Sequence, residues 1–339
     1  MQPFLQNKRV LITGGGGSIG SELCRQAAAQ SPRELILLDI NENGAFSVQQ
    51  ELLGRYGRSF PLRVEIASIR DLPRLEAVFA ETGPEVVLHA AAHKHVPFME
   101  LNPGEAVKNN ILGTWNLLQA AEHAGSERLV FISTDKAVRP SSVMGASKRA
   151  AERLLLPGGT TRLAAVRFGN VADSAGSVLP LFRRQIAGGG PVTVTDPRMT
   201  RFFMTIPEAA GLVLDAARLA EGGELFVLDM GAPVSILALA EGLIREAGLV
   251  PHRDIPILYT GLRPGEKLTE ELLTPAEQEG ALRRGKILQT ALSPFAPEER
   301  DRVLENLRRA AGSGSRREIL CALREAVPDY CPKEEESPA

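Results

Sequence analysis

A glycine-rich segment near the N-terminus constrains the fold of this 339-residue chain more than any other feature. The apolar run Arg9–Ile12 leads into Thr13-Gly14-Gly15-Gly16-Gly17-Ser18-Ile19-Gly20, and strong helix formers follow from Ser21 to Ala29. Glycines spaced three apart between a strand and a helix allow a tight turn and close approach of the backbone to a pyrophosphate, which then lies on the helix N-terminus. A flexible linker would not need these flanking elements. The predicted phosphate-binding residues are Gly14, Gly17, Ser18, Ile19 and Gly20.

An acidic residue follows at the distance that such a turn requires. Asp39 ends a second strand-like run, Glu34–Leu38, nineteen residues after Gly20. A carboxylate in this place accepts hydrogen bonds from the adenosine ribose hydroxyls and repels a 2′-phosphate. No arginine follows in the segment 40–43. We therefore expect NAD in preference to NADP, with a solvated strand-end carboxylate as the alternative interpretation of Asp39.

Strand-like and helix-like segments alternate along the first 170 residues. Segments of helical length and composition separate the short apolar runs. Apolar runs without polar alternation are typical of strands that are buried on both faces. We therefore predict an α/β fold, a doubly wound parallel (Rossmann) sheet with a smaller C-terminal substrate lobe. The predicted strands are 9–12, 34–38, 62–66, 86–89, 129–133 and 163–168.

After Val171 the alternation of strand-like and helix-like segments becomes less regular. Gly188-Gly189-Gly190-Pro191 is a clear breaker, and a strand is expected at 192–194. Pro207 opens a predicted helix, and a strand is expected at 225–230. The predicted units are a dinucleotide-binding domain of residues 1–170 plus 207–230, a substrate lobe of 171–206 plus 231–300, and C-terminal helices with an acidic tail, 301–339.

Composition excludes several classes of protein. Lys plus Arg is 39 and Asp plus Glu is 41, a net charge of −2, so the electrostatic argument for nucleic-acid binding is missing. Three cysteines cannot form a disulfide framework and none has zinc-site spacing. No apolar run is long enough to span a membrane. We expect a cytoplasmic protein with reduced thiols. His93 and His95 lack a third ligand in the sequence, so we expect pocket-lining histidines and no metal.

Five motifs lie along most of the chain. They are Gly14-x-x-Gly17-x-x-Gly20, Ala90-Ala91-Ala92, Asn110-x-x-Gly113-Thr114, Arg167-Phe168-Gly169-Asn170-Val171 and Arg263-Pro264-Gly265-Glu266-Lys267. Together these motifs resemble the extended short-chain dehydrogenase/reductases. The last one resembles the nucleotide-sugar clamp of the sugar-modifying members. The resemblance implies that the smaller lobe binds a nucleotide sugar.

Three further motifs are more specific. They are His93-Lys94-His95-Val96-Pro97, Ser133-Thr134-Asp135-Lys136-Ala137 and Asp196-Pro197-Arg198-Met199-Thr200-Arg201-Phe202-Phe203. They resemble the UDP-N-acetylglucosamine 4,6-dehydratases of polysaccharide and glycan biosynthesis. This resemblance implies a hydro-lyase with catalytic NAD(P) that forms a UDP-4-keto-6-deoxy-N-acetylhexosamine, and we expect a homo-oligomer. Many relatives carry an N-terminal membrane region, so we expect either a soluble member or an excised catalytic part.

The resemblance carries binding roles to matching positions. Arg201 and Arg263 are expected to contact the diphosphate and ribose, since a guanidinium suits these groups better than an ammonium. The expected cofactor contacts beyond the glycine turn and Asp39 are Ser68, Ile69, Ala90, Ala91, Ala92, Lys94, Asn110 and Lys148. The expected substrate contacts are Lys94, Asn170, Ser177, Pro180, Thr193, Arg201, Arg263 and Glu266. The family's usual acid after the third strand is replaced by Ser68.

The catalytic pattern departs from most of the family. A tyrosine usually stands four residues before the lysine, whereas here Met144 precedes Lys148. A thioether cannot transfer a proton, and the pattern resembles a methionine-containing subgroup that retains the configuration at sugar carbon 5. Dehydration needs a base for the carbon 5 proton and an acid for the leaving hydroxyl. Asp135 and Lys136 are the candidates, in an order that the residues leave open, with Thr134 holding the 4-hydroxyl. The charge of Lys148 would lower the pKa of the oxidised hydroxyl.

Two other functions remain open at this point. One is a nucleotide-sugar 4-epimerase or reductase on the same scaffold, in which a tyrosine would be expected and Asp135-Lys136 would have no evident role. The other is a catalytically silent NAD-binding protein, which the missing tyrosine favours.

Overall fold

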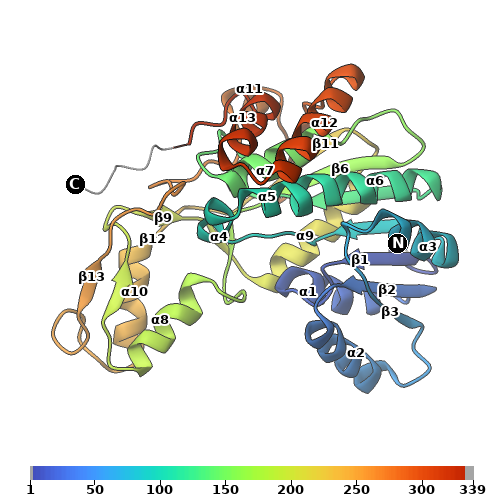
Figure 1. The fold of residues 1–339 in the computed structure, drawn as a ribbon. Helices are drawn as coiled ribbons and strands as arrows, with labels where there is room; N and C mark the ends of the chain where they lie inside the picture. The colour runs from blue at the N-terminus through green and yellow to red at the C-terminus, as the bar shows by residue number, and fades with distance from the viewer. Residues whose placement is uncertain (1–2, 333–339) are drawn as a thin grey trace.

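The computed structural model describes residues 3–332, in which helices cover both faces of one nine-stranded sheet (Figure 1). The strand order is β14-β15-β11-β6-β5-β4-β1-β2-β3. Six consecutive strands have the 3-2-1-4-5-6 arrangement of a doubly wound sheet, which confirms the predicted fold. The parallel strands are β1 (Arg9–Thr13), β2 (Glu34–Asp39), β3 (Leu62–Ile66), β4 (Val86–His89), β5 (Arg128–Ile132), β6 (Arg162–Arg167) and β11 (Glu224–Leu228).

Each central strand is buried on both faces, which explains its unbroken apolar sequence. In β1, Val10 and Ile12 belong to one core and Leu11 belongs to the other. One face is covered by α1 (Ser18–Ala28), α2 (Glu42–Tyr56) and α9 (Ile206–Leu219). The other face is covered by α3 (Leu72–Thr82), α4 (Val96–Leu101), α5 (Pro103–Ala106), the π-helix η1 (Val107–Gly113), α6 (Thr114–His123) and α7 (Val143–Arg153).

The smaller lobe lies at the left in Figure 1, and its buried residues form a core of their own. Phe182, Val194, Ile244 and Ile257 are buried there together. Its elements are α8 (Val178–Ala187), β8 (Val192–Val194), α10 (Ile236–Glu246) and β13 (Ile257–Tyr259). Two short strand pairs connect it with the large sheet: β7 (Asn170–Val171) with β10 (Phe203–Met204), and β9 (Thr200–Arg201) with β12 (Val234–Ser235).

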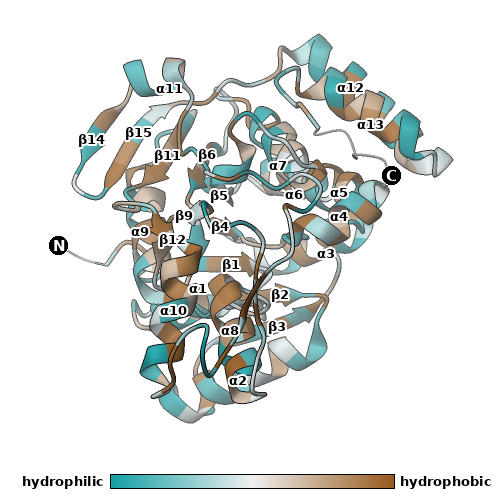
Figure 2. Ribbon diagram, turned by 90° about the vertical axis from the view of Figure 1, so that its left-hand side faces the viewer, coloured by the Kyte–Doolittle hydropathy of each residue, from teal (hydrophilic) through white to brown (hydrophobic). Residues whose placement is uncertain are grey.

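Residues 282–291 belong to the large sheet, whereas the sequence placed them in a substrate lobe that reached residue 300. β14 (Leu282–Arg284) and β15 (Ile287–Ala291) form a hairpin, and β15 pairs antiparallel with β11. Figure 2 shows the hairpin beside β11. Gly285 opens the two-residue turn with φ of +63°, a backbone conformation that glycine adopts readily. This local turn signal directs the chain back along the edge of the sheet.

The C-terminal helices are α12 (Pro297–Ser313) and α13 (Arg316–Ala326), so the first begins four residues before the expected boundary at 301. They follow the short helix α11 (Pro275–Glu279) and pack into the core that contains η1 and α7. The acidic tail predicted at 333–336 lies outside the described residues. In the range 3–332, no helix is both long enough and apolar enough to cross a membrane.

Candidate active site

The glycine turn after β1 is packed too tightly for side chains. A Cβ on Gly20 would lie 1.9 Å from the Gly14 carbonyl oxygen, and one on Gly14, whose φ is +68°, would lie 2.6 Å from the Ala91 nitrogen. The Gly17 amide donates a 3.0 Å hydrogen bond to the Gly14 carbonyl. Gly17 is the N-cap of α1 and has no side chain to occupy the first free amides of the helix. These amides can therefore receive an anionic group.

Asp39 holds the glycine turn from the end of β2. Its Oδ2 accepts a 2.8 Å hydrogen bond from the Gly16 amide, and its Oδ1 accepts one of 2.8 Å from the Asn41 amide. The carboxylate is therefore fixed beside the turn and still has free lone pairs. The contact of Asp39 with ribose hydroxyls remains a prediction.

A cavity of about 700 Å³ runs along the carboxyl ends of the parallel strands. Parallel strands place their ligands at this edge. His93 and His95 line the cavity, as expected for loop histidines. The predicted site residues that also line it are Gly14, Gly17, Ser18, Ile19, Gly20, Ala90, Ala92, Lys94, Thr134, Lys136, Met144, Lys148, Asn170 and Ser177.

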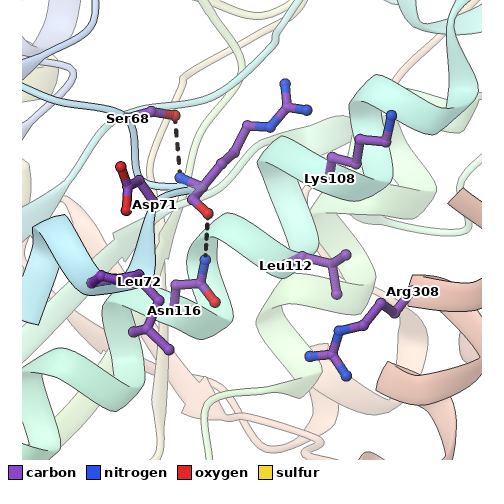
Figure 3. A pocket seen from close by; sticks show the side chains of 9 residues that line it. Ser68, Asp71, Leu72, Lys108, Leu112, Asn116 and Arg308 are labelled. Carbon is purple, nitrogen blue, oxygen red and sulfur yellow. Dashed lines mark hydrogen bonds between the residues drawn. The ribbon is translucent and has the colours of Figure 1, made fainter. Parts of the chain in front are cut away.

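Ser68 lies at a different pocket, of about 560 Å³, between α3, the η1–α6 helix and α12. Figure 3 shows Ser68 at one end of this pocket and Arg308 at the other. The Ser68 hydroxyl accepts a 3.2 Å hydrogen bond from the Arg70 amide. Among residues 3–332, the two pockets share no lining residue. The predicted contact of Ser68 with adenine remains a prediction.

Several other predicted contacts lie behind the cavity wall. Ile69 is 3% exposed and packs against Gly113. Asn110 is buried, where its Nδ2 donates to the His93 carbonyl at 3.0 Å and its Oδ1 accepts from the His93 amide at 2.8 Å. It therefore fixes the loop that carries His93. Three further predicted contacts do not line the cavity: Ala91, which contacts Gly14, Pro180 in the first turn of α8, and Thr193, which binds Gln185.

The Thr134-Asp135-Lys136 run forms a polar network at the start of the short 3₁₀-helix η2 (Asp135–Ala137), in which Asp135 is buried and Thr134 and Lys136 are half-buried. Thr134 Oγ1 donates to Asp135 Oδ1 at 2.8 Å, and Lys136 Nζ donates to the same oxygen at 2.9 Å. Lys136 Nζ also donates to Asn170 Oδ1 at 3.1 Å. Burial alone would lower the pKa of Lys136, but the carboxylates of Asp135 and Glu270 raise it above its ordinary value. Lys136 is therefore held as an ammonium.

Met144 and Lys148 lie one turn apart on α7, so both reach the cavity. Ser142 caps this helix by accepting a 3.0 Å hydrogen bond from the Gly145 amide. Lys148 is 6% exposed, and its Nζ lies 4.0 Å from the centre of the Phe131 ring. Burial lowers the pKa of Lys148 to about 7, and Glu152 opposes this shift. Without a bound anion or polar ligand, Lys148 therefore changes its charge near neutral pH.

A smaller cavity of about 160 Å³ adjoins Lys136 and Asn170, and Arg201, Arg263 and Glu266 line it too. Arg201 is 5% exposed. Its terminal nitrogens donate to backbone carbonyls, to Thr200 at 2.7 Å and to Lys267 at 2.8 Å. These bonds fix the loop after Arg263. The structure therefore gives Arg201 a supporting role in addition to the predicted diphosphate contact.

A buried ion network behind the cavity was not anticipated from the sequence. Arg167 ends β6 fully buried, with ion pairs of 2.7 Å to Glu152 of α7 and 3.0 Å to Glu277 of α11. Arg149 pairs with the same two carboxylates at 3.0 Å. Burial would raise the pKa of Glu277, but the guanidinium groups of Arg167 and Arg149 and the hydrogen bond from the Thr274 amide together lower it to about 2. Within the motif 167–171, Arg167 thus anchors helices, while Phe168, Gly169 and Asn170 line the cavity.

The sheet order, the glycine turn and the cavity at the carboxyl ends of the strands define a doubly wound Rossmann fold with a candidate nucleotide-binding site. The model of the polysaccharide biosynthesis protein family matches residues 10–291, and the chain belongs to that family. It is related to nucleotide-sugar dehydratases and epimerases.

Individual relatives illustrate this range. The chain is 54% identical to the probable polysaccharide biosynthesis protein EpsC of Bacillus subtilis, covering 80% of this chain and 46% of EpsC. It is 34% identical to a UDP-N-acetylglucosamine 4,6-dehydratase (inverting) of Campylobacter jejuni, over 80% of this chain and 79% of that protein. A UDP-glucose 4-epimerase of Rickettsia rickettsii is 35% identical over 80% and 79% of the two chains. The chain spans about half the length of the first curated relatives.

A solved structure agrees with the fold over most of the chain. Pen from Bacillus thuringiensis is 36% identical and superposes with a TM-score of 0.79, over 86% of this chain and 89% of Pen.

Proposed function

We propose that this chain is a nucleotide-sugar 4,6-dehydratase that uses NAD and converts UDP-N-acetylglucosamine into a UDP-4-keto-6-deoxy-N-acetylhexosamine. The observation that carries the proposal is the hydrogen-bonded Thr134–Asp135–Lys136 network, whose Thr134 and Lys136 line the cavity with Met144 and Lys148. Acid and base groups in hydrogen-bond contact, at the edge where the fold binds its ligands, are what water elimination requires. The 34% identity to a dehydratase of this name supports the same conclusion.

The residues present fit NAD. Gly17, the N-cap of α1 without a side chain, lines the cavity together with Ser18 and Ile19, so a pyrophosphate there would meet the free amides of the helix. Asp39 lies where it can accept from ribose hydroxyls and repel a 2′-phosphate, and it favours NAD over NADP. When bound, NAD supplies the removal of hydride from sugar carbon 4 and its return to carbon 6.

The side chains around the cavity have roles that follow from their contacts. Thr134 positions the 4-hydroxyl of the sugar. Lys136, which is held as an ammonium, gives a proton to the hydroxyl that leaves carbon 6, and Asp135 takes the proton from carbon 5. Lys148 in its charged form lowers the pKa of the 4-hydroxyl during its oxidation. Met144 fills the place of a tyrosine without supplying a proton-transfer group.

A single incubation tests the proposal. The purified protein is mixed with UDP-N-acetylglucosamine without added cofactor, and the sugar nucleotide is examined by mass spectrometry. Loss of one water molecule, with the cofactor retained on the protein, is the expected result. Recovery of the substrate unchanged would refute the proposal and favour a silent NAD-binding protein.

The second candidate is a nucleotide-sugar 4-epimerase, which the 35% identity to a UDP-glucose 4-epimerase favours. An epimerase would return an isomer of unchanged mass in the same incubation. The network around Asp135 has no evident role in that reaction, so the dehydratase is the better-supported function.

A further inference from the structure

A buried carboxyl group that the roles above do not use lies beside Lys136. Glu270 precedes α11, and 3% of its side chain is exposed. Its Oε1 is 3.8 Å from Lys136 Nζ and 3.9 Å from Arg201 Nη2. Its Oε2 is buried and has no hydrogen-bond partner within residues 3–332. An unpartnered buried oxygen is destabilising, so a purely structural ion pair would be expected to saturate it.

A second carboxyl oxygen near Lys136 also lacks a hydrogen-bond partner among residues 3–332. Asp135 is fully buried, and its Oδ2 also has no hydrogen-bond partner in the described part of the chain. The Lys136 ammonium therefore pairs with two carboxyl groups, Asp135 and Glu270, and each of them has one oxygen that accepts no hydrogen bond among the described residues. Lys136 and Glu270 line the same small cavity, which opens beside Asn170. The arrangement can receive and release protons without first breaking a saturated hydrogen-bond network.

The proposed dehydration requires a group that holds a proton for part of the reaction, and the Glu270 carboxyl can do this. This inference rests on the proposed function. The sugar releases protons from the 4-hydroxyl and from carbon 5. It takes one proton back at carbon 5, and a second leaves with the carbon 6 hydroxyl as water, while the hydride lost at carbon 4 returns at carbon 6. The proton of the 4-hydroxyl must therefore reach whichever group protonated the leaving oxygen. Asp135 and Lys136 are both engaged at carbons 5 and 6 during this transfer.

We propose that Glu270 holds a proton temporarily for the Asp135–Lys136 pair. By doing so it returns the pair to its starting protonation state in every turnover. A path of successive contacts runs from Thr134 Oγ1 through Asp135 Oδ1 to Lys136 Nζ, with distances of 2.8 and 2.9 Å, and then 3.8 Å to Glu270 Oε1. Glu270 starts as a carboxylate, accepts a proton through Lys136, and gives it back when the leaving oxygen has been protonated. It acts on Lys136 and not on the sugar, so it is a positioning residue.

The charges around Glu270 are consistent with this use. Burial raises the pKa of Glu270, and the neighbouring Asp135 carboxylate raises it further. Lys136 of η2, Arg201 of β9 and Lys267 of the same loop lower it, but the net direction is upward from its ordinary value of 4.5. Glu270 therefore binds a proton more readily than a solvated glutamate, while Lys136 opposite it remains an ammonium.

The test is the dependence of kcat on pH in the full chain, with UDP-N-acetylglucosamine as substrate. Glu270→Gln keeps the shape of the side chain and removes its ionisation. We expect kcat to fall by about 10–100-fold with KM within about twofold, because an interaction used only during turnover is lost. The acidic limb of the wild-type profile, expected above pH 4.5, should also disappear in the variant.

Glu271→Gln is the matched control, because Glu271 is the next residue and pairs with Arg139 at the surface. Its kcat and pH profile should match the wild type. A wild-type kcat and profile in Glu270→Gln would overturn the inference, while absence of water loss in the wild type would overturn the proposed function instead. If Glu270→Gln does not fold, Glu270→Asp decides: a shorter acid should lower kcat by about 3–10-fold and keep the acidic limb. An unchanged kcat in Glu270→Asp would also refute the proposal.

Discussion

The two ends of the cavity are built from different parts of the protein. At the glycine turn, the proposed cofactor contacts are backbone amides, and the segment 14–20 is continuous in sequence. Around Lys136, charged side chains come from η2, β9 and the loop that carries Glu270, and β7 adds the amide of Asn170. The first end depends on the absence of side chains, and the second depends on buried charge. A single added carbon should therefore disable the first, and a single lost charge should disable the second.

The largest expected effect is at the charged end. Asp135→Asn or Lys136→Ala should lower the rate of water loss by about 10²–10⁴-fold, the usual contribution of a proton-transfer group. Binding of NAD should persist, because neither side chain belongs to the glycine turn. Rates are measured by mass spectrometry of the sugar nucleotide, and NAD binding by calorimetry. Asp254→Asn, at an exposed pair with Arg253, is the control and should keep the wild-type rate.

The glycine end should fail in the opposite way. Gly20→Ala would place a Cβ 1.9 Å from the Gly14 carbonyl oxygen, so the turn must distort. We expect NAD affinity to fall by about 100-fold, equivalent to about 2.7 kcal/mol. Gly54→Ala in α2 is the control, because a Cβ there meets nothing within 4 Å. That substitution should keep the NAD affinity and add about 0.5–1 kcal/mol of stability. Wild-type affinity in Gly20→Ala would show that the backbone does not form the site.

Replacing Asp39 tests the role of the carboxylate that holds the glycine turn. Asp39→Ala should weaken NAD by about tenfold, which is the loss of a charge-assisted hydrogen bond to the ribose. NADP should weaken far less, because its 2′-phosphate is no longer repelled. Both affinities are measured by calorimetry on the same preparation. A wild-type protein that binds NADP more tightly than NAD would contradict this assignment.

The smallest expected effect is at Met144, between the two ends. In a site that depends on tyrosine, Met144→Tyr would raise the rate, since a phenolate near Lys148 would act as the base. Here we expect no gain, or a loss of a few-fold, because a rigid phenol replaces a flexible thioether that is 4% exposed. Turnover is measured as above. A large increase would mean that the chain is a damaged tyrosine enzyme.

The same contrast separates what the sequence could predict from what it could not. β3, β4 and β8 lie at the residues predicted for them, because buried strands have local apolar patterns. The glycine turn is likewise a local signal. Glu270 and the carbonyl bonds of Arg201 depend on contacts between distant segments, for which a single sequence gives no spacing rule. The hairpin of β14 and β15 did have a signal, the Gly285 turn, and it could have been recognised.

The ion network behind the cavity sets a limit on how the protein can be shortened. Arg167 and Arg149 share two carboxylates, and one of them, Glu277, comes from α11 near the end of the matched region. A fragment that stops before residue 275 would keep the buried Arg167 and the half-buried Arg149 but only one of the two carboxylates that pair with them. Removing one partner from a buried ion pair costs about 3–5 kcal/mol, a large share of the stability of an ordinary domain. A minimal fragment for expression or crystallisation therefore has to extend past α11.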